Sequence, residues 1–303
     1  MSRRLLALIP TLLVISAITF FMGFAAPSNP VEIMLGEKGT PTQIDRLKHQ
    51  YGLDQPALVQ YGRFLWNAVH GDLGLSYAYP GRPVREMVQK GFENSVKLGI
   101  LAMLYAGILG VLLGIIAAVN RGGPLDLFTM FLAVAGVSVP NFILALIGIY
   151  WIAVKWHLLP VSGWGKPAHY ILPMLILGTR SMALIARITR SSMLEVLHLE
   201  YVRTARAKGL SAFRVVFKHA VRNALIPVVT VLGTALGGLL TGAFVVEIIF
   251  SVPGLGQTAV NAIFTRDYPV IQISTLLIAV VFVLVNLIVD LSYGLIDPRI
   301  RYG

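Results

Sequence analysis

The 303-residue sequence contains no cysteine and few charged residues. Without cysteine there is no disulfide framework, no thiol nucleophile and no thiolate metal site. Charged residues make up 13% of the chain, against about 25% in soluble globular domains. Hydrophobic residues make up 56% and occur in long blocks rather than at amphipathic spacing. This composition indicates a protein that folds in lipid.

Several kinds of functional motif are also missing. The six histidines lack the spacing of metal ligands, and no Ser/His/Asp or paired-carboxylate arrangement suggests hydrolysis. No G-x-x-x-x-G-K-[ST] motif occurs, so ATP and Mg are not expected to bind this chain. The net charge of +11 comes from basic residues between apolar blocks, without interleaved aromatics. This placement favours membrane topology over nucleic-acid binding. We therefore predict no catalytic residue, metal site, bound cofactor or nucleic-acid partner.

Long apolar stretches are the main feature that is present. A helix needs about 20 mainly apolar residues to cross a bilayer. Six stretches meet this length: residues 5–26, 96–119, 125–154, 171–188, 225–249 and 271–296. The first is longer than the apolar core of a signal peptide and is expected to remain uncleaved. The sequence therefore predicts an all-α polytopic membrane protein with six transmembrane helices.

The short loops predict the orientation. Most of the positive charge in the short loops falls on the side of the two termini: Arg3, Arg4, Arg121 and residues 190–222. Positive loops remain in the cytoplasm, whereas long loops cross regardless of charge. We expect both termini to be cytoplasmic, in a bacterial inner membrane.

The long outer loop, residues 27–95, is expected to form a small domain between an N-terminal helix (1–26) and a five-helix core (96–303). Residues 42–51 suggest an amphipathic helix that Thr42 could cap. Residues 55–70 suggest a second one, and Gly71-Asp72-Leu73-Gly74 a turn.

The cytoplasmic segment 190–224 is far longer than a connection between two helices requires. Good helix formers continue from Ser191 to Lys208, where Gly209 breaks the run. Ser211 can cap a second helix, 212–225, which Pro227 is expected to end. Arg214, Lys218 and Arg222 form a basic stripe on this amphipathic helix. The stripe is compatible with anionic lipid headgroups and with a cytoplasmic protein partner.

The sequence Glu200-Tyr201-Val202-Arg203-Thr204-Ala205-Arg206-Ala207-Lys208-Gly209-Leu210 resembles the cytoplasmic "EAA" loop of binding-protein-dependent importers, in its dipeptide/oligopeptide form. By the family spacing, Arg203-Thr204-Ala205 takes the place of the triplet and Gly209 that of the glycine. Only Ala205 of the triplet is retained, and His219-Ala220-Val221-Arg222 replaces the usual I-x-L-P. Both departures resemble the peptide-importer branch.

Further segments resemble the same branch, in order, across almost the whole chain. They include Tyr51-Gly52-Leu53-Asp54-Gln55-Pro56, Leu159-Pro160-Val161-Ser162-Gly163, Arg222-Asn223-Ala224-Leu225-Ile226-Pro227, Pro253-Gly254-Leu255-Gly256 and Asp297-Pro298-Arg299-Ile300-Arg301.

The resemblance implies a type I ABC importer permease fold and a set of partners. These are a second homologous permease, two cytoplasmic ATPase subunits that bind ATP and Mg, and an extracytoplasmic solute-binding protein. It implies that the ATPases are coupled through Glu200, Arg203, Thr204, Ala205, Arg206, Lys208, Gly209 and Leu210. The implied solute is a di- or oligopeptide; a nickel chelate, glutathione or a sugar would use the same machinery.

Three polar residues within the apolar stretches are candidates for the translocation path. Arg180 lies near the centre of the fourth stretch, where it would pair with a carboxylate (Glu247 or Asp290), face a solute carboxylate, or extend toward the interface. Asn141 follows Pro140 and marks either a packing kink or a break that opens backbone carbonyls to a cavity. Glu247 is either an interfacial carboxylate or part of an outer gate.

Small residues in the fifth stretch, Gly233, Gly237, Gly238 and Gly242, suggest close helix packing, with the second permease as the expected neighbour. Two rival functions remain open. An ion-driven secondary transporter would predict inverted repeats and acidic residues at mid-membrane, and neither is clear. A non-transporting scaffold would need only the long cytoplasmic segment.

Overall fold

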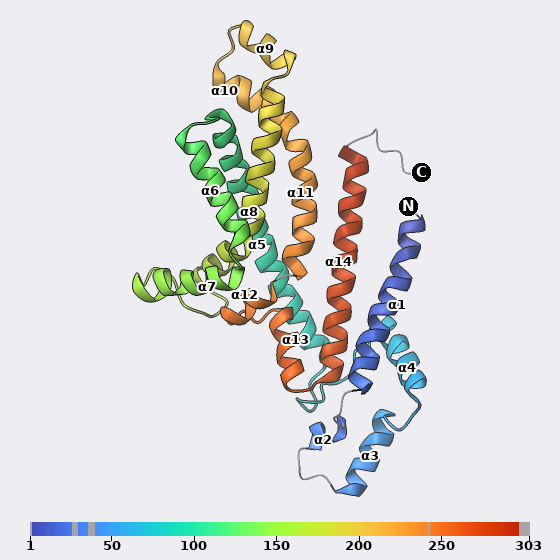
Figure 1. The fold of residues 1–303 in the computed structure, drawn as a ribbon. Helices are drawn as coiled ribbons and strands as arrows, with labels where there is room; N and C mark the ends of the chain where they lie inside the picture. Colours follow the sequence, from blue (N-terminus) through green and yellow to red (C-terminus); the bar gives the residue numbers. More distant parts are fainter. Residues whose placement is uncertain (1, 26–29, 36–39, 242, 297–303) are drawn as a thin grey trace. The chain divides into compact units, whose positions relative to one another are not determined.

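The computed structural model describes residues 2–25, 30–35, 40–241 and 243–296, and the regular structure of these residues is helical (Figure 1). One isolated antiparallel bridge joins Leu75 and Pro83. The N-terminal helices are α1 (Ser2–Ala25), α2 (Pro30–Leu35), α3 (Pro41–Tyr51) and α4 (Ala57–Val69). The central helices are α5 (Val84–Val119), α6 (Pro124–Ser138), α7 (Asn141–Gly148) and α8 (Pro167–Leu197). The C-terminal helices are α9 (Glu200–Ala207), α10 (Ala212–Arg214), α11 (Val221–Thr241), α12 (Phe244–Ile249), α13 (Leu255–Phe264) and α14 (Tyr268–Ile296).

The predicted all-α membrane fold is confirmed. Within the described residues, four helices are long and apolar enough to cross a membrane: α5, α8, the continuous helix Ala212–Leu239, and α14. The bent pair formed by α6 and by α7 with the residues that follow it to Lys155 counts as a fifth if taken as one span. The described part of α1 adds a shorter apolar helix, Ile9–Ala25. The described residues of each of the six predicted stretches are therefore mainly helical, with the third and fifth divided into two helices.

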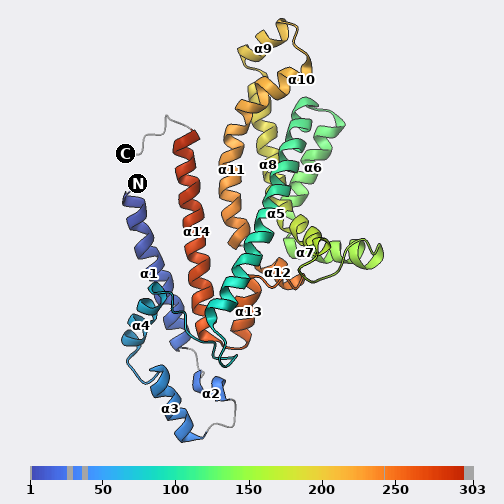
Figure 2. The same cartoon turned by 180° about the vertical axis from the view of Figure 1, so that it is seen from behind.

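The third predicted span is wrong as a single helix. Residues 124–138 and 141–155 form two helices bent by 109° at Val139 and Pro140. Pro140 fixes its own φ and disfavours helical geometry at Val139, whose φ of −86° and ψ of 123° are extended. In both views α7 turns sharply away from α6 (Figure 1, Figure 2). The chain then continues from α7 into a π-helical segment, Ile149–Lys155.

Pro227 does not end the second cytoplasmic helix as predicted. It lies inside α11, and α10, a π-helical segment (Val215–Ala220) and α11 follow one another directly. Membrane helices tolerate an internal proline because neighbouring groups and local π adjustments satisfy the freed carbonyl. The fifth predicted span also differs at its other end, where α11 stops at Thr241 and Phe244–Ile249 forms the separate helix α12.

Two smaller predictions near the chain's polar segments need correction. The cap of α3 is Thr40 rather than Thr42; the Thr40 backbone N–H donates to Gln43 Oε1 at 3.0 Å. The predicted run from Ser191 to Lys208 is interrupted at His198 and Leu199, between α8 and α9.

The chain divides into two compact units. One comprises Met1–Ser95 and Pro253–Val283, and the other comprises Val96–Val252 and Leu284–Gly303. The predicted functional division into residues 1–26, 27–95 and 96–303 follows chain order and stays a prediction.

A buried carboxylate organises the first unit. Asp267 is fully buried; it accepts a hydrogen bond from Ser76 Oγ and another from the Tyr77 backbone N–H at 3.0 Å. These bonds attach the turn before α5 to the start of α14. Around them lies an apolar core of Val84, Val88, Leu255, Ala262, Val270 and Ile273.

Close helix packing at glycines forms the second unit. A Cβ on Gly114 of α5 would lie 2.6 Å from the Ala186 carbonyl oxygen of α8, and one on Gly110 would lie 2.8 Å from that of Met182. A Cβ on Gly178 of α8 would meet the Ala102 carbonyl oxygen of α5 at 2.8 Å. Only glycine allows backbones to approach this closely. The position of α8 beside α5 therefore depends on these three residues.

The glycines of α11 were expected to face a second permease, and two of them have a neighbour in α14 of the same chain: Gly233, and Gly237, whose Cβ would lie 3.5 Å from Val285. A Cβ on Gly233 would lie 2.8 Å from Val289 of α14, whereas one on Gly238 would meet nothing within 4 Å. Gly242 lies outside the described residues. Gly233 is thus occupied by internal packing, and its assignment to a partner surface is wrong.

Candidate functional site

The predicted coupling segment forms a helical hairpin between α8 and α11. After α8 ends at Leu197, two residues lead into α9, and Gly209 then reverses the chain. Gly209 has a φ of +74°, in the left-handed region that favours glycine. Its N–H donates to the Arg206 carbonyl at 2.9 Å, and the Leu210 N–H donates to that of Ala205 at 3.4 Å. The break at Gly209 is therefore an ordered C-terminal cap.

A small apolar core holds the hairpin together. Val202 and Ala205 of α9 are buried against Val215, which follows α10. Val196, Leu197 and Leu210 pack around these three. Fully burying a valine contributes about 1.5–3 kcal/mol. Ala205, the one retained residue of the family triplet, thus lies in this core, where a larger side chain would not fit without displacement.

Polar contacts fix the outer face of α9. Arg203 Nη1 lies 3.1 Å from Glu200 Oε1, with the two side chains 64% and 85% exposed, so this ion pair contributes about 0.3–0.5 kcal/mol at most. Thr204 Oγ1 donates to the Glu200 carbonyl at 3.0 Å. Tyr201 Oη accepts a hydrogen bond from Asn223 Nδ2 at 2.7 Å, which links α9 to α11.

Both ends of the hairpin continue into membrane-length helices. α8 has 31 residues, and the helix that begins at Ala212 runs to Leu239 within the described residues. Two apolar clusters join these helices to α5: Ile115, Ala118, Met193, Ala220 and Ala224 in one, and Ala106, Ile185 and Val228 in the other. A displacement of α9 would therefore be transmitted to α8, α11 and α5 together.

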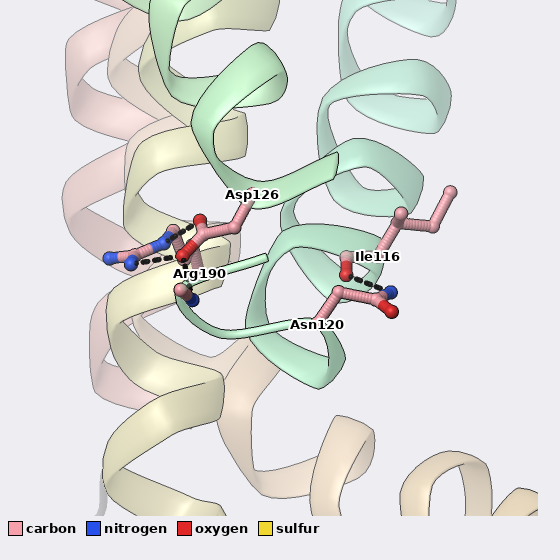
Figure 3. A network of polar contacts seen from close by, with 5 residues as sticks. Ile116, Asn120, Asp126 and Arg190 are labelled. Carbon is pink, nitrogen blue, oxygen red and sulfur yellow. Dashed lines mark hydrogen bonds and ion pairs between the residues drawn. The ribbon is translucent and has the colours of Figure 1, made fainter. Parts of the chain in front are cut away.

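A buried ion pair, which the sequence analysis did not identify, holds α6 to α8. Arg190 Nε lies 2.5 Å from Asp126 Oδ1 and Nη2 lies 2.7 Å from Oδ2 (Figure 3). The Gly122 backbone N–H donates to the same carboxylate at 2.9 Å. Nearby, Asn120 Nδ2 donates to the Ile116 carbonyl at 2.8 Å and caps the end of α5 (Figure 3). These contacts fix the α5–α6 turn against the helix that leads into α9.

Two of the three predicted path residues come together. Arg180 and Asn141 line one pocket of about 300 Å³, beside the break between α6 and α7. The other lining residues are Val137, Ser138, Val139, Pro140, Phe142, Val245 and Val246. Glu247 follows the last of these and is buried, with 1% of its surface exposed; it is not among the described residues that line the pocket.

The ion-pair hypothesis for Arg180 finds no support in the described residues. Arg180 is exposed, and no described carboxylate lies within ion-pairing distance of it. The side chain of Asp290, the other candidate partner, lies outside the described residues. The guanidinium thus faces an open pocket in the middle of a membrane-length helix.

Two families match the chain. Residues 110–302 match the family "Binding-protein-dependent transport system inner membrane component", and residues 1–84 match its N-terminal counterpart. Together they cover most of the chain, including the coupling segment.

Named relatives match along their full length. The chain is 45% identical to a dipeptide transport system permease protein of Bacillus subtilis, over 99% of this chain and 97% of the relative. It is 43% identical to the Escherichia coli K12 protein of the same description, over 99% and 98%. A glutathione transport system permease protein of Escherichia coli K12 is 44% identical, again over 99% and 98%.

Solved structures support the fold. A chain of the MetNI methionine ABC transporter, in an inward-facing conformation, superposes with a TM-score of 0.59 at 17% identity; the match covers 70% of this chain and 97% of that one. A chain of an amino acid ABC transporter gives a TM-score of 0.55 at 16% identity, over 69% and 94%. From the family match and the full-length relatives, this multi-pass membrane chain belongs to the binding-protein-dependent transport system inner membrane components.

Proposed function

We propose that the chain is one permease subunit of an ATP-driven importer of di- or oligopeptides. The observation that carries the proposal is the hairpin around Gly209, whose two ends continue into α8 and the helix leading to α11. A short, ordered element fixed to two membrane helices can act as a rigid lever between an external motor and a transport path. The motor is then a pair of ATPase subunits that bind ATP and Mg outside this chain.

The orientation follows from where such a motor sits. α9 faces the cytoplasm, both termini lie on that side, and the residues between α1 and α5 lie outside. A solute-binding protein delivers the peptide from outside, and a second homologous permease completes the path. The residues that contact the ATPase are Glu200, Arg203, Thr204, Ala205, Arg206, Lys208, Gly209 and Leu210, with Ala205 acting from the core of the hairpin.

An exposed aromatic pair supports a protein partner. Phe213 and Phe217 are 69% and 45% exposed, and their ring centroids lie 4.5 Å apart. They lie soon after the Gly209 turn, and each is followed directly by an exposed basic residue, Arg214 and Lys218. Large aromatic side chains in such positions are typical of the central residues of protein interfaces.

The solute class rests on the relatives and on Arg180. Dipeptides and glutathione, named for the relatives, are short peptides that carry a free carboxylate. An exposed arginine in an apolar helix is costly unless it faces water or an anion, at about 2.5–3.5 kcal/mol on insertion scales. We therefore assign Arg180 to recognition of the peptide carboxylate, with Asn141 beside it and Glu247 as part of the supporting wall.

Arg180→Gln is expected to raise the KM for dipeptide uptake at least about tenfold, because a charge-assisted hydrogen bond worth roughly 1.5–3 kcal/mol is lost. The uptake of a dipeptide whose C-terminus is an amide should change little. Arg187→Gln, an exposed arginine of the same helix outside the pocket, is the matched control. Unchanged kinetics for the free dipeptide in a stably folded Arg180→Gln complex would exclude this role.

Isolation of the complex tests the function itself. The chain, tagged in its own cell and extracted in mild detergent, should co-purify with two ATPase subunits and a second permease, as identified by mass spectrometry. Reproducible isolation of the chain alone in several detergents would contradict the proposal and favour an ion-driven secondary transporter.

A further inference from the structure

A second pocket lies beside α9 and shares no lining residue with the Arg180 pocket, although its Arg203 and Arg206 also belong to the proposed ATPase contact. It has a volume of about 450 Å³ and lies between α9 and the ends of α5 and α8. Its lining consists of Ala118, Val119, Arg121, Leu194, Leu197, His198, Arg203, Arg206, Ala212, Val215 and Val216. All of these residues belong to one compact unit.

The charge of this pocket has one sign. Arg121 comes from the α5–α6 turn, and Arg203 and Arg206 come from one face of α9. No Asp or Glu is among the described residues that line it. Asp126, the nearest acidic residue along the chain to Arg121, already accepts hydrogen bonds from Nε and Nη2 of Arg190. Arg121, Arg203 and Arg206 thus line one space, and only Arg203 has a carboxylate partner, Glu200, 3.1 Å from its Nη1. The net positive charge of this lining fits an anion with several oxygen atoms.

Apart from His198, the rest of the lining is aliphatic, and much of it lies at the ends of the membrane helices. Ala118 and Val119 are the last residues of the apolar part of α5, and Leu194 and Leu197 lie in the last turn of α8. The described lining residues include no Phe, Tyr or Trp, and the one ring among them, the imidazole of His198, has its Nδ1 2.6 Å from the Leu194 carbonyl oxygen. The pocket therefore offers cationic groups next to an apolar wall, at the point where the membrane helices change to polar segments.

We propose that this pocket binds the phosphate group of an anionic phospholipid of the cytoplasmic leaflet. Basic pockets between membrane helices on this side bind anionic headgroups, and each nearby Lys or Arg contributes about 1 kcal/mol. Arg121, Arg203 and Arg206 contact the phosphate, and the acyl chains lie along the aliphatic ends of α5 and α8. The lipid then joins the α5–α6 turn to α9. This placement rests on the cytoplasmic orientation in the proposed function.

Native mass spectrometry of the purified complex tests the site. The complex is delipidated in detergent and titrated with phosphatidylglycerol or with zwitterionic phosphatidylcholine. The wild type should retain phosphatidylglycerol selectively. Arg121→Gln should weaken this binding about fivefold, from the loss of one arginine contact. Arg222→Gln removes the same charge from an exposed position outside the pocket, and it should bind like the wild type.

Four outcomes would overturn the proposal. Equal binding in Arg121→Gln and the wild type would mean that the lipid binds elsewhere. An equal loss in both variants would indicate general surface charge. Complete displacement of phosphatidylglycerol by millimolar inorganic phosphate would indicate a site for free anions rather than for a lipid. Loss of the ATPase subunits from Arg121→Gln before any lipid is added would show that the pocket receives a protein carboxylate.

The same titration on the isolated full-length chain separates this proposal from the proposed function. If the chain binds phosphatidylglycerol selectively but recruits no ATPase, the lipid site is supported and the transport proposal is contradicted.

Discussion

At the scale of single residues, the proposed coupling depends on the backbone conformation of Gly209. Its φ of +74° is costly for residues with a side chain, by roughly 1–2 kcal/mol. A Cβ at this position would meet no atom within 4 Å, so a substitution acts through the backbone and not through a clash. The residue therefore permits a test in which packing stays constant.

We predict that coupling declines in the order Gly209→Asn, Gly209→Ala, Gly209→Val. Asparagine tolerates the left-handed region best of the three, and the β-branched valine tolerates it least. Gly209→Pro should be more severe than any of these, since it also removes the N–H that donates to the Arg206 carbonyl. The measurement is uptake per ATP hydrolysed in proteoliposomes that contain the whole complex.

If Gly209→Val transported as efficiently per ATP as Gly209→Asn, the left-handed turn would not be required for coupling. Thermal melting of each purified complex is the control. A variant that melts like the wild type but transports less per ATP is uncoupled, whereas one that melts earlier has a folding defect.

Tyr77 provides a residue-level prediction about pH. Burial, together with the nearby Tyr51 and Asp267, raises the pKa of Tyr77 to about 12. The unfolded chain loses this proton near pH 10, whereas the folded chain keeps it until about pH 12. The unfolded state thus binds fewer protons in this window, and stability falls as pH rises from 10 to 12, by roughly 2 kcal/mol or less.

Tyr77→Phe should remove this part of the pH dependence, because phenylalanine does not ionise. Thermal melting of the wild type and the variant between pH 8 and pH 12 measures the effect, with Tyr79→Phe, an exposed tyrosine two residues on, as the control. Parallel curves for wild type and Tyr77→Phe would show that the Tyr77 phenol ionises alike in both states.

At the scale of the helices, Asp126 and Arg190 fix α6 to α8 by two hydrogen bonds, with the Asp126 side chain only 4% exposed and that of Arg190 27% exposed. Removing one partner leaves a largely buried charge without its counterion, which costs about 3–5 kcal/mol for a fully buried pair. Arg190 keeps some contact with solvent, so the lower end of this range applies.

We predict that Asp126→Asn and Arg190→Gln each lower the melting temperature strongly, while the double variant loses much less than the sum of the two. The double-mutant cycle isolates the interaction of the pair. Additive losses would mean that the two side chains contribute independently. Because the α5–α6 turn carries Arg121, the single variants should also weaken phosphatidylglycerol binding at the adjacent pocket.

The helices also show what the sequence could predict and why the rest was missed. Six apolar stretches identified the membrane helices, since hydropathy depends on composition alone. The interruption at Pro140 was expected as a kink or a break, but its size, 109°, was not. Pro227 was expected to end a helix and instead lies within α11, because the effect of a proline depends on its neighbours.

The close approach of α5 to α8 does have a signal in the sequence. Gly110 and Gly114 are spaced as in the G-x-x-x-G motif of packed membrane helices, and both contact α8. The Asp126–Arg190 pair had no such signal, because its partners are 64 positions apart in the sequence. The pocket shared by Arg180 and Asn141 likewise required the break between α6 and α7 to be known.

At the scale of the whole molecule, α8 (Pro167–Leu197) connects the two candidate sites. Its residue Arg180 lines the pocket, and its C-terminal end leads into the coupling hairpin. α8 packs against α5 through glycines, against α6 through the ion pair, and against α11 through apolar side chains. A movement at α9 therefore has a continuous, closely packed route to the pocket that we assign to the solute. Such a route is what an importer driven from the cytoplasm requires.

The most direct test of this account is uptake of a labelled dipeptide by proteoliposomes that contain the purified complex, with ATP inside and the solute-binding protein outside. The account predicts accumulation that requires hydrolysable ATP, is lost with a non-hydrolysable analogue, and persists when ion gradients are dissipated. Accumulation that instead follows an imposed ion gradient and ignores ATP would contradict it.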